Sequence, residues 1–165
     1  MHEAIPGHYA QLVYANKSPS IVKSIFGNGA MVEGWAVYSE RMMLESGYGN
    51  NDPEMWLMYS KWNLRSVTNT ILDYSVHVQG MTEPEAIDLL TRQAFQTAAE
   101  AKEKWRRAQL TSVQLTSYFS GYSEIMELRE QRRAALGSKF SLKDFHEDFL
   151  SYGSAPVRVI KELMQ

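Results

Sequence analysis

The sequence predicts an all-α protein, and three observations support this prediction. Apolar residues recur every three or four positions along nearly the whole chain, which is the period of an amphipathic helix. The strict alternation of apolar and polar residues that marks a half-buried strand is missing. Helix start and stop signals separate the periodic segments. We therefore expect a multi-helix domain without a sheet.

Four helices are expected in the first half of the chain. Their approximate ranges are 6–16, 18–26, 30–46 and 53–79. Residues 27–29 (Gly-Asn-Gly) form a turn between the second and third helices. Residues 51–53 (Asn-Asp-Pro) combine a capping side chain with a proline at the first helical position, and Gly80 ends the helix that follows.

Capping signals also mark the helices of the second half. Thr82 and Glu85 form a capping box that starts one helix, and Ser141 with Asp144 starts another. Gly137 is a C-terminal stop for the helix before it. After the helix that begins at the capping box, the expected ranges are 99–110, 112–135, 141–152 and 157–164.

Length and composition limit the possible classes of protein. The 165 residues are enough for one domain with its own core, so residues 1–165 are expected to form a single helical domain. The net charge of −2 argues against a nucleic-acid partner. No apolar run approaches the roughly 18 residues that a membrane span needs. Because the chain has no cysteine, any metal site must consist of histidine and carboxylate ligands.

The motif HEAIPGH at residues 2–8 contains two histidines and a glutamate next to a Pro-Gly pair. Zinc peptidases commonly place two histidines at i and i+4 on a helix, but His2 and His8 are six residues apart. A regular helix would point them about 120° apart, so they could not bind one metal ion. Pro6 cannot donate a backbone hydrogen bond, and Gly7 can adopt a sharp bend. The Pro-Gly pair is therefore expected to distort the backbone and return His8 to the side of His2.

Two interpretations of this motif remain open on its spacing alone. In the first, His2 and His8 are metal ligands, and Glu3 is the base that takes a proton from a metal-activated water. In the second, the motif is a helix start with capping residues, and His8 merely packs against its neighbours.

A second motif, EGWAVYSE at residues 33–40, favours the metal site. Glu33 follows His8 by a few tens of residues and lies on another predicted helix, as the third ligand of a helical His₂Glu zinc site does. Gly34 would allow that helix to approach another backbone closely. Glu40 lies on roughly the same face as Glu33, where it is either a hydrogen-bond partner for a ligand histidine or a solvated charge near Arg41.

These motifs together resemble DUF885, a bacterial family of unknown function whose members look like helical zinc metallopeptidases of the gluzincin type. The resemblance continues through ILDYSVHVQGMTEPEAIDLL, QLTSYFSGYSEIMELREQ and LGSKFSLKDFHEDFLSYGSAPV, so it spans nearly the whole chain. It implies a zincin-like helical fold with one zinc ion. Family members are several times longer, and the resemblance implies that this chain corresponds to their C-terminal catalytic part. The chain is therefore expected to be a fragment of a larger helical protein.

Other residues are further candidates, each with a structural alternative. The resemblance makes Tyr118 and His146 candidates for stabilising an oxyanion, although either is equally explained as a core side chain with a satisfied polar tip. His77 is a candidate for the substrate cleft, whereas pairing with Asp73 at i,i+4 is the favoured structural alternative. Arg107, next to Arg106, is a candidate for binding a substrate carboxylate, although such a pair is more often a solvated helix face.

Two functional hypotheses follow from the sequence. The first is a zinc-dependent, metallopeptidase-like hydrolase that acts on a peptide-like substrate. The second is a non-catalytic helical module that binds a partner or another copy of itself, because a fragment exposes apolar faces. Met31, Trp35, Tyr38 and Met42 form a stripe that is either such a face or, as we favour, part of the core. The sequence leaves the localisation open.

Overall fold

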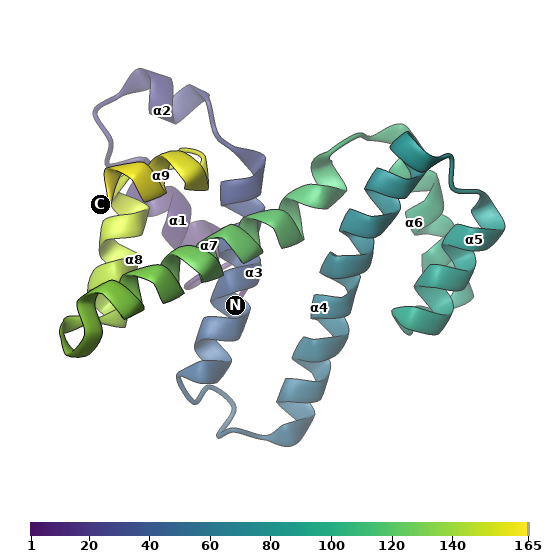
Figure 1. The fold of residues 1–165 in the computed structure, drawn as a ribbon, viewed down its shortest axis with the longest axis horizontal. Coiled ribbons are helices and arrows are strands. Elements are labelled where there is room, and N and C mark those ends of the chain that lie inside the picture. The colour runs from purple at the N-terminus through teal and green to yellow at the C-terminus, as the bar shows by residue number, and fades with distance from the viewer. Residues whose placement is uncertain (165) are drawn as a thin grey trace. The chain divides into compact units, whose positions relative to one another are not determined.

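The computed structural model describes residues 1–164, apart from the side chain of Ser24. Within that part of the chain all regular structure is helical, which confirms the all-α prediction (Figure 1). The α-helices are α1 (His8–Ala15), α2 (Ile21–Ile25), α3 (Gly29–Glu45), α4 (Pro53–Tyr74), α5 (Glu83–Asp88), α6 (Ala98–Leu110), α7 (Gln114–Leu136), α8 (Leu142–Ser151) and α9 (Val157–Leu163). Two π-helical turns, η1 (Ser75–Gln79) and η2 (Leu89–Gln93), extend α4 and α5, and the 3-10 turn η3 (Gly137–Lys139) follows α7.

Most helix boundaries follow the capping chemistry of the sequence. The Asp52 side chain accepts a hydrogen bond from the Glu54 amide, and the Ser141 side chain accepts one from the Asp144 amide. The capping box at Thr82 is also present. The prediction was wrong at the first helix, which begins at His8 rather than at residue 6 because the preceding residues form a wide turn.

The chain divides into two compact units. The first unit comprises Met1–Met43 and Ser120–Gln165, and the second comprises Leu44–Phe119. We describe each unit by itself.

Helix α3 runs through the core of the first unit. All six side-chain positions from Gly34 to Ser39 are buried, so this part of the helix has no solvent face. Met31, Trp35, Tyr38 and Met42 are among the buried residues, which places the stripe recognised in the sequence in the core.

The backbones of α3 and α7 touch where two glycines meet. A Cβ atom on Gly34 would lie 2.3 Å from the carbonyl carbon of Gly121, and one on Gly121 would lie 1.7 Å from the carbonyl oxygen of Ala30. Any side chain at either position would therefore collide with backbone atoms. The expectation that Gly34 permits a close helix approach is confirmed.

The second unit has its own small core, formed by α4, the α5–η2 segment, α6 and the start of α7. Its fully buried members are Leu72, Ala86, Leu90, Ala101, Ala108 and Leu115. The carboxylate of Asp73, which is also buried, accepts hydrogen bonds from the amides of Val113 and Thr116 and from the Thr116 hydroxyl. The first amides of a helix have no acceptor within the helix. The Asp73 carboxylate therefore supplies acceptors for amides at the N-terminal end of α7.

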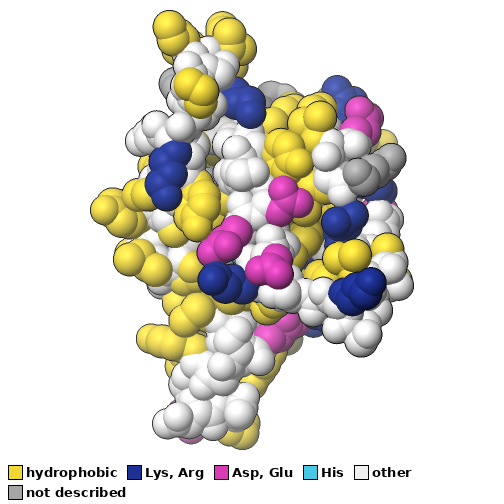
Figure 2. Space-filling model, turned by 90° about the vertical axis from the view of Figure 1, so that its left-hand side faces the viewer, with side chains coloured by type: hydrophobic (Ala, Val, Ile, Leu, Met, Phe, Trp, Pro, Cys, Tyr) yellow, Lys and Arg dark blue, Asp and Glu magenta, His cyan; other side chains and the backbone are white. Residues whose placement is uncertain are grey.

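The short helix α2 exposes apolar side chains. Ile21, Val22, Ile25 and Phe26 are between 65% and 74% exposed. Figure 2 shows hydrophobic side chains at the top of the view, at the height where α2 lies in Figure 1. None of the helices among residues 1–164 combines the length and the apolar character that crossing a membrane requires.

Candidate metal centre

Residues 2–8 fold into a wide turn that brings two histidines together. Three successive amides donate to carbonyls six residues earlier: Gly7 to Met1 at 3.1 Å, His8 to His2 at 2.8 Å and Tyr9 to Glu3 at 3.0 Å. The Ile5–Pro6 peptide bond is cis. In the turn closed by these three hydrogen bonds, the rings of His2 and His8 lie with their centroids 5.0 Å apart. The predicted effect of the Pro-Gly pair is thus confirmed in its geometry.

The turn leaves no room for a side chain at Gly7. A Cβ atom at this position would lie 1.7 Å from the carbonyl oxygen of His2 and 2.4 Å from that of Met1. The close approach of these backbone atoms therefore requires glycine at this position.

Glu33 reaches the two histidines from α3. Its Oε2 atom lies 3.5 Å from Nε2 of His8 and 4.0 Å from Nε2 of His2. Two ligand atoms of one tetrahedral zinc ion lie about 3.3 Å apart when each is about 2.0–2.1 Å from the metal. The distance from Glu33 to His8 is close to this spacing, and the distance from Glu33 to His2 is somewhat longer.

Glu3 belongs to the same cluster. One potential ligand atom from each of His2, Glu3 and His8 lies within 4.8 Å of the others. Glu3 is exposed, whereas the two histidines are half-buried. Since Glu3 follows His2 directly, the turn that positions the histidines positions this carboxylate as well.

Glu40 fixes the orientation of the His2 ring. Its Oε1 atom lies 2.7 Å from Nδ1 of His2, and this hydrogen bond raises the pKa of His2 against the opposing effect of burial. Because a carboxylate only accepts, Nδ1 carries the proton and Nε2 faces Glu33. Of the two interpretations of Glu40, the contact supports that of a partner to a candidate ligand histidine.

Trp35 also connects α3 to the turn, through a contact that was not predicted from the sequence. Its indole N–H donates to the carbonyl oxygen of Pro6 at 2.9 Å. Sequence analysis assigned Trp35 to an apolar stripe, which describes its burial but not the direction of its N–H group. No local pattern connects residues 6 and 35, so only the folded backbone shows that they meet.

His146 on α8 is held by a buried tyrosine. Its Nε2 lies 2.7 Å from the hydroxyl of Tyr38, and that hydroxyl also accepts a hydrogen bond from Nη1 of Arg129 at 3.5 Å. Since arginine only donates, the Tyr38 hydroxyl keeps its own proton available for Nε2 of His146. Burial and, secondarily, the Arg129 charge lower the pKa of His146 to about 4, so the ring is neutral at pH 7.

The remaining candidates lie in the second unit. Nε2 of His77 is 2.9 Å from the carbonyl oxygens of both Ala108 and Thr111 and 3.4 Å from Asp73. These contacts join α4 and its π turn to α6 and correspond to the structural alternative given for His77.

Arg107 and Tyr118 both contact the side chain of Gln114. Arg107 donates to Oε1 of Gln114 at 2.7 Å, and Nε2 of Gln114 donates to the Tyr118 hydroxyl at 3.4 Å. The functional roles of His77, Arg107 and Tyr118 stay predictions.

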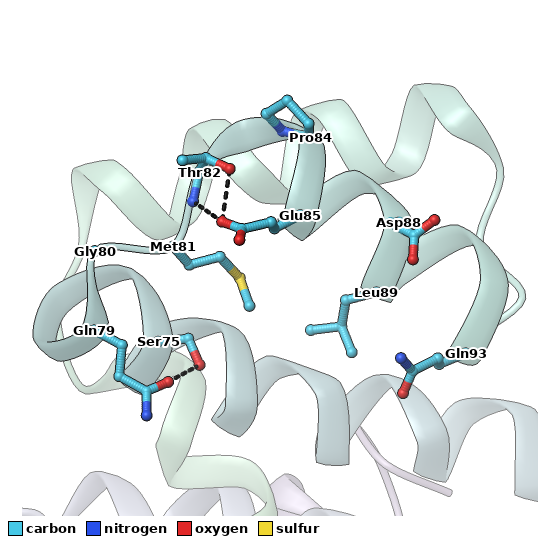
Figure 3. A pocket seen from close by; sticks show the side chains of 10 residues that line it. All are labelled: Ser75, Gln79, Gly80, Met81, Thr82, Pro84, Glu85, Asp88, Leu89 and Gln93. Carbon is cyan, nitrogen blue, oxygen red and sulfur yellow. Dashed lines mark hydrogen bonds between the residues drawn. The ribbon is translucent and has the colours of Figure 1, made fainter.

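An open pocket of about 760 Å³ lies in the second unit between η1 and the α5–η2 segment (Figure 3). Several of its polar side chains pair with near neighbours: Ser75 donates to Gln79, and Glu85 accepts from Thr82. None of the residues predicted from the sequence as catalytic, substrate-binding or metal-binding lines this pocket.

The fold and the cluster together define an all-α protein with a half-buried group of histidines and carboxylates. The chain belongs to DUF885, a family described as bacterial proteins of unknown function, whose model matches residues 1–164. This confirms the family that the sequence motifs indicated. No curated protein matches the sequence.

Two solved structures are similar over nearly the whole chain. One, described as a "putative lipoprotein of unknown function from Shewanella oneidensis", is 70% identical with a TM-score of 0.96. The other, described as a "putative lipoprotein from Colwellia psychrerythraea", is 30% identical with a TM-score of 0.90. The alignments cover 99% and 98% of this chain but 30% and 28% of those chains, so the present chain spans less than a third of their length.

Proposed function

We propose that this chain contributes the metal centre of a zinc-dependent, metallopeptidase-like hydrolase. The observation that carries the proposal is the convergence of His2, His8 and Glu33, with the carboxylate 3.5 Å and 4.0 Å from the two Nε2 atoms. Two imidazoles and one carboxylate are the ligand set of catalytic His₂Glu zinc sites.

The state of the His2 ring supports a cation at this position. With its proton on Nδ1 toward Glu40, His2 directs Nε2 toward the Glu33 carboxylate. The acidic neighbours raise the pKa of His2, so this position favours a positive charge, which either a proton on Nε2 or a metal ion supplies. The donor set and its spacing therefore fit zinc.

When bound, zinc lowers the pKa of a coordinated water toward about 7 and polarises a carbonyl group. His2, His8 and Glu33 would hold the ion, and Glu40 would keep His2 in the ligating tautomer. Glu3 would accept the proton of the attacking water on its carboxylate and donate it to the leaving amine of a peptide-like substrate. His146 is proposed as a neutral hydrogen-bond donor for the oxyanion through its Nδ1–H group.

Metal analysis of protein purified without chelator tests the site. We expect close to one equivalent of zinc in the parent chain and a loss of most of it in Glu33→Ala. Glu162→Ala is a matched control, because Glu162 is an exposed glutamate in the same unit. Less than about a tenth of an equivalent in the parent, unchanged by Glu33→Ala, would refute the assignment.

The catalytic part of the proposal needs a separate measurement. Glu3→Gln keeps the shape of the side chain but removes its ability to take a proton. We expect this variant to retain zinc and to lose about 10²–10⁴-fold of the peptide hydrolysis rate, which is the usual contribution of a general base. The assay uses a mixed peptide library with products identified by mass spectrometry. Equal rates in the parent and in Glu3→Gln would contradict the role of Glu3.

A further inference from the structure

We propose that Trp35 is a positioning residue for the turn that carries His2 and His8. Its indole N–H holds the Pro6 carbonyl at 2.9 Å and thereby fixes the middle of the turn against α3. The inference rests on the proposed function only in that it takes the turn to be the metal-binding element.

The bond is located where it can affect the positions of both histidines. Pro6 lies between His2 and His8, and Glu40 anchors only the His2 end of the turn. Trp35 is two residues beyond Glu33, so one turn of α3 supplies both the third candidate ligand and the anchor. A bond at Pro6 therefore ties the two-histidine turn directly to the backbone that positions Glu33.

Trp35 is itself held rigidly. Its side chain is 1% exposed. The indole stacks on Phe149 with centroids 5.8 Å apart and an interplanar angle of 17°, and it meets the rings of Tyr38 and His146 at 5.5 Å. An N–H group on a ring confined in this way has one available direction, and that direction points to the turn.

Loss of the N–H group should make the turn less rigid while the core packing is kept. Trp35→Phe keeps an aromatic ring against Phe149 but leaves the Pro6 carbonyl without this donor. Outer-shell partners of metal ligands typically contribute 10–100-fold to metal affinity. We therefore expect zinc to bind Trp35→Phe 10–100-fold more weakly than it binds the parent chain.

The first experiment is a competition titration of zinc against a chromophoric chelator, together with the absorption spectrum of the Co²⁺ form. Phe149→Leu is the matched control, because it removes one ring contact of the indole while Tyr38, His146 and the bond to Pro6 still hold the N–H in place. Phe149→Leu should lower the melting temperature while zinc affinity and the Co²⁺ spectrum stay those of the parent. Unchanged affinity in Trp35→Phe, or an equal loss in Phe149→Leu, would overturn the proposal.

A second experiment works without metal and separates this inference from the proposed function. Amide hydrogen exchange of the metal-free protein should speed up in Trp35→Phe at Gly7, His8 and Tyr9, the three amides that close the turn. Phe149→Leu should leave these three amides closer to the parent. If the parent binds no zinc, the proposed function fails and this exchange result still decides the role of Trp35. Unchanged exchange at all three amides overturns that role.

Should Trp35→Phe not fold, site-specific replacement of the indole by the isosteric benzothiophene side chain removes only the N–H group. The same titration and exchange measurements then apply, with the same outcomes deciding.

Discussion

At the scale of single residues, His146 shows how burial sets a protonation state. The ring lies among Trp35, Tyr38 and Phe145, and its Nε2 is hydrogen-bonded to the Tyr38 hydroxyl. Both the low-dielectric surroundings and the Arg129 charge disfavour an imidazolium, with burial as the larger cause of the lowered pKa.

The lowered pKa of His146 predicts a loss of stability in acid. The folded value of about 4 is below the ordinary 6.5, so the unfolded chain binds more protons between these two values. The contribution is fully present above pH 6.5 and falls by on the order of 3 kcal/mol as the pH drops to about 4. Urea unfolding at several pH values should show a shallower loss in His146→Gln than in the parent. Identical pH dependence in the two proteins would mean that His146 does not titrate as stated.

Glu40 gives a second residue-scale prediction. Glu40→Ala removes the acceptor for Nδ1 of His2, so the imidazole loses its fixed tautomer and orientation. We expect a 10–100-fold weaker zinc affinity by chelator competition, with the far-ultraviolet circular dichroism unchanged. Glu124→Ala, an exposed glutamate on α7, is the control and should bind zinc as the parent does. Equal zinc affinities in Glu40→Ala and Glu124→Ala would show that Glu40 does not orient a zinc ligand.

At the scale of elements, the contact between α3 and α7 depends on two glycines. Helices come this close only when no side chain separates their backbones. The contact lies next to Glu33 in the chain, so it also determines where that carboxylate stands.

Alanine at Gly121 should therefore be costly. The added methyl group would meet the Ala30 carbonyl oxygen at 1.7 Å, which forces the two helices apart. We expect a loss of about 3 kcal/mol in the free energy of unfolding, at the upper end for overpacking, measured by denaturant titration. Gly27→Ala is the matched control, because its new methyl group would meet only the Cβ of Ser154 at 3.7 Å. A Gly121→Ala protein as stable as Gly27→Ala would show that the helices can separate freely.

At the scale of the whole molecule, all proposed metal-binding residues belong to the first unit. The range Met1–Met43 contains the proposed ligands His2, His8 and Glu33, and it also contains Glu3 and Glu40, which lie beside them. A ligand that binds only the folded state stabilises the part of the protein that holds its site.

Zinc should therefore protect the two units unequally. Hydrogen exchange followed by mass spectrometry, with and without zinc, should show gains in residues 1–43 and 120–164 and small changes in 44–119. The Glu33→Ala protein serves as the control and should show no gain in either unit. Equal protection of both units by zinc would contradict a site confined to the first.

How much could be predicted from the sequence depended on the distance between interacting residues along the chain. The caps at Asp52 and Ser141 were predictable because each involves residues two or three positions apart. The wide turn was predictable because proline and glycine impose local limits on the backbone. The contact of Tyr38 with His146 joins residues 108 positions apart, and the buried position of Arg129 likewise results from tertiary packing. No local pattern contains such information.

The complete burial of α3 between Gly34 and Ser39 affects which amino-acid substitutions the protein tolerates. A helix with one solvent face accepts substitutions at every third or fourth position, so its tolerance follows the helical period. Six consecutive buried positions remove that period. In a library that varies each codon, this stretch should appear as an unbroken block of intolerance, whereas the exposed positions Ile21, Val22, Ile25 and Phe26 should accept polar replacements freely. A mutational map would then identify the helix that carries the proposed metal ligand Glu33, without any measurement of zinc.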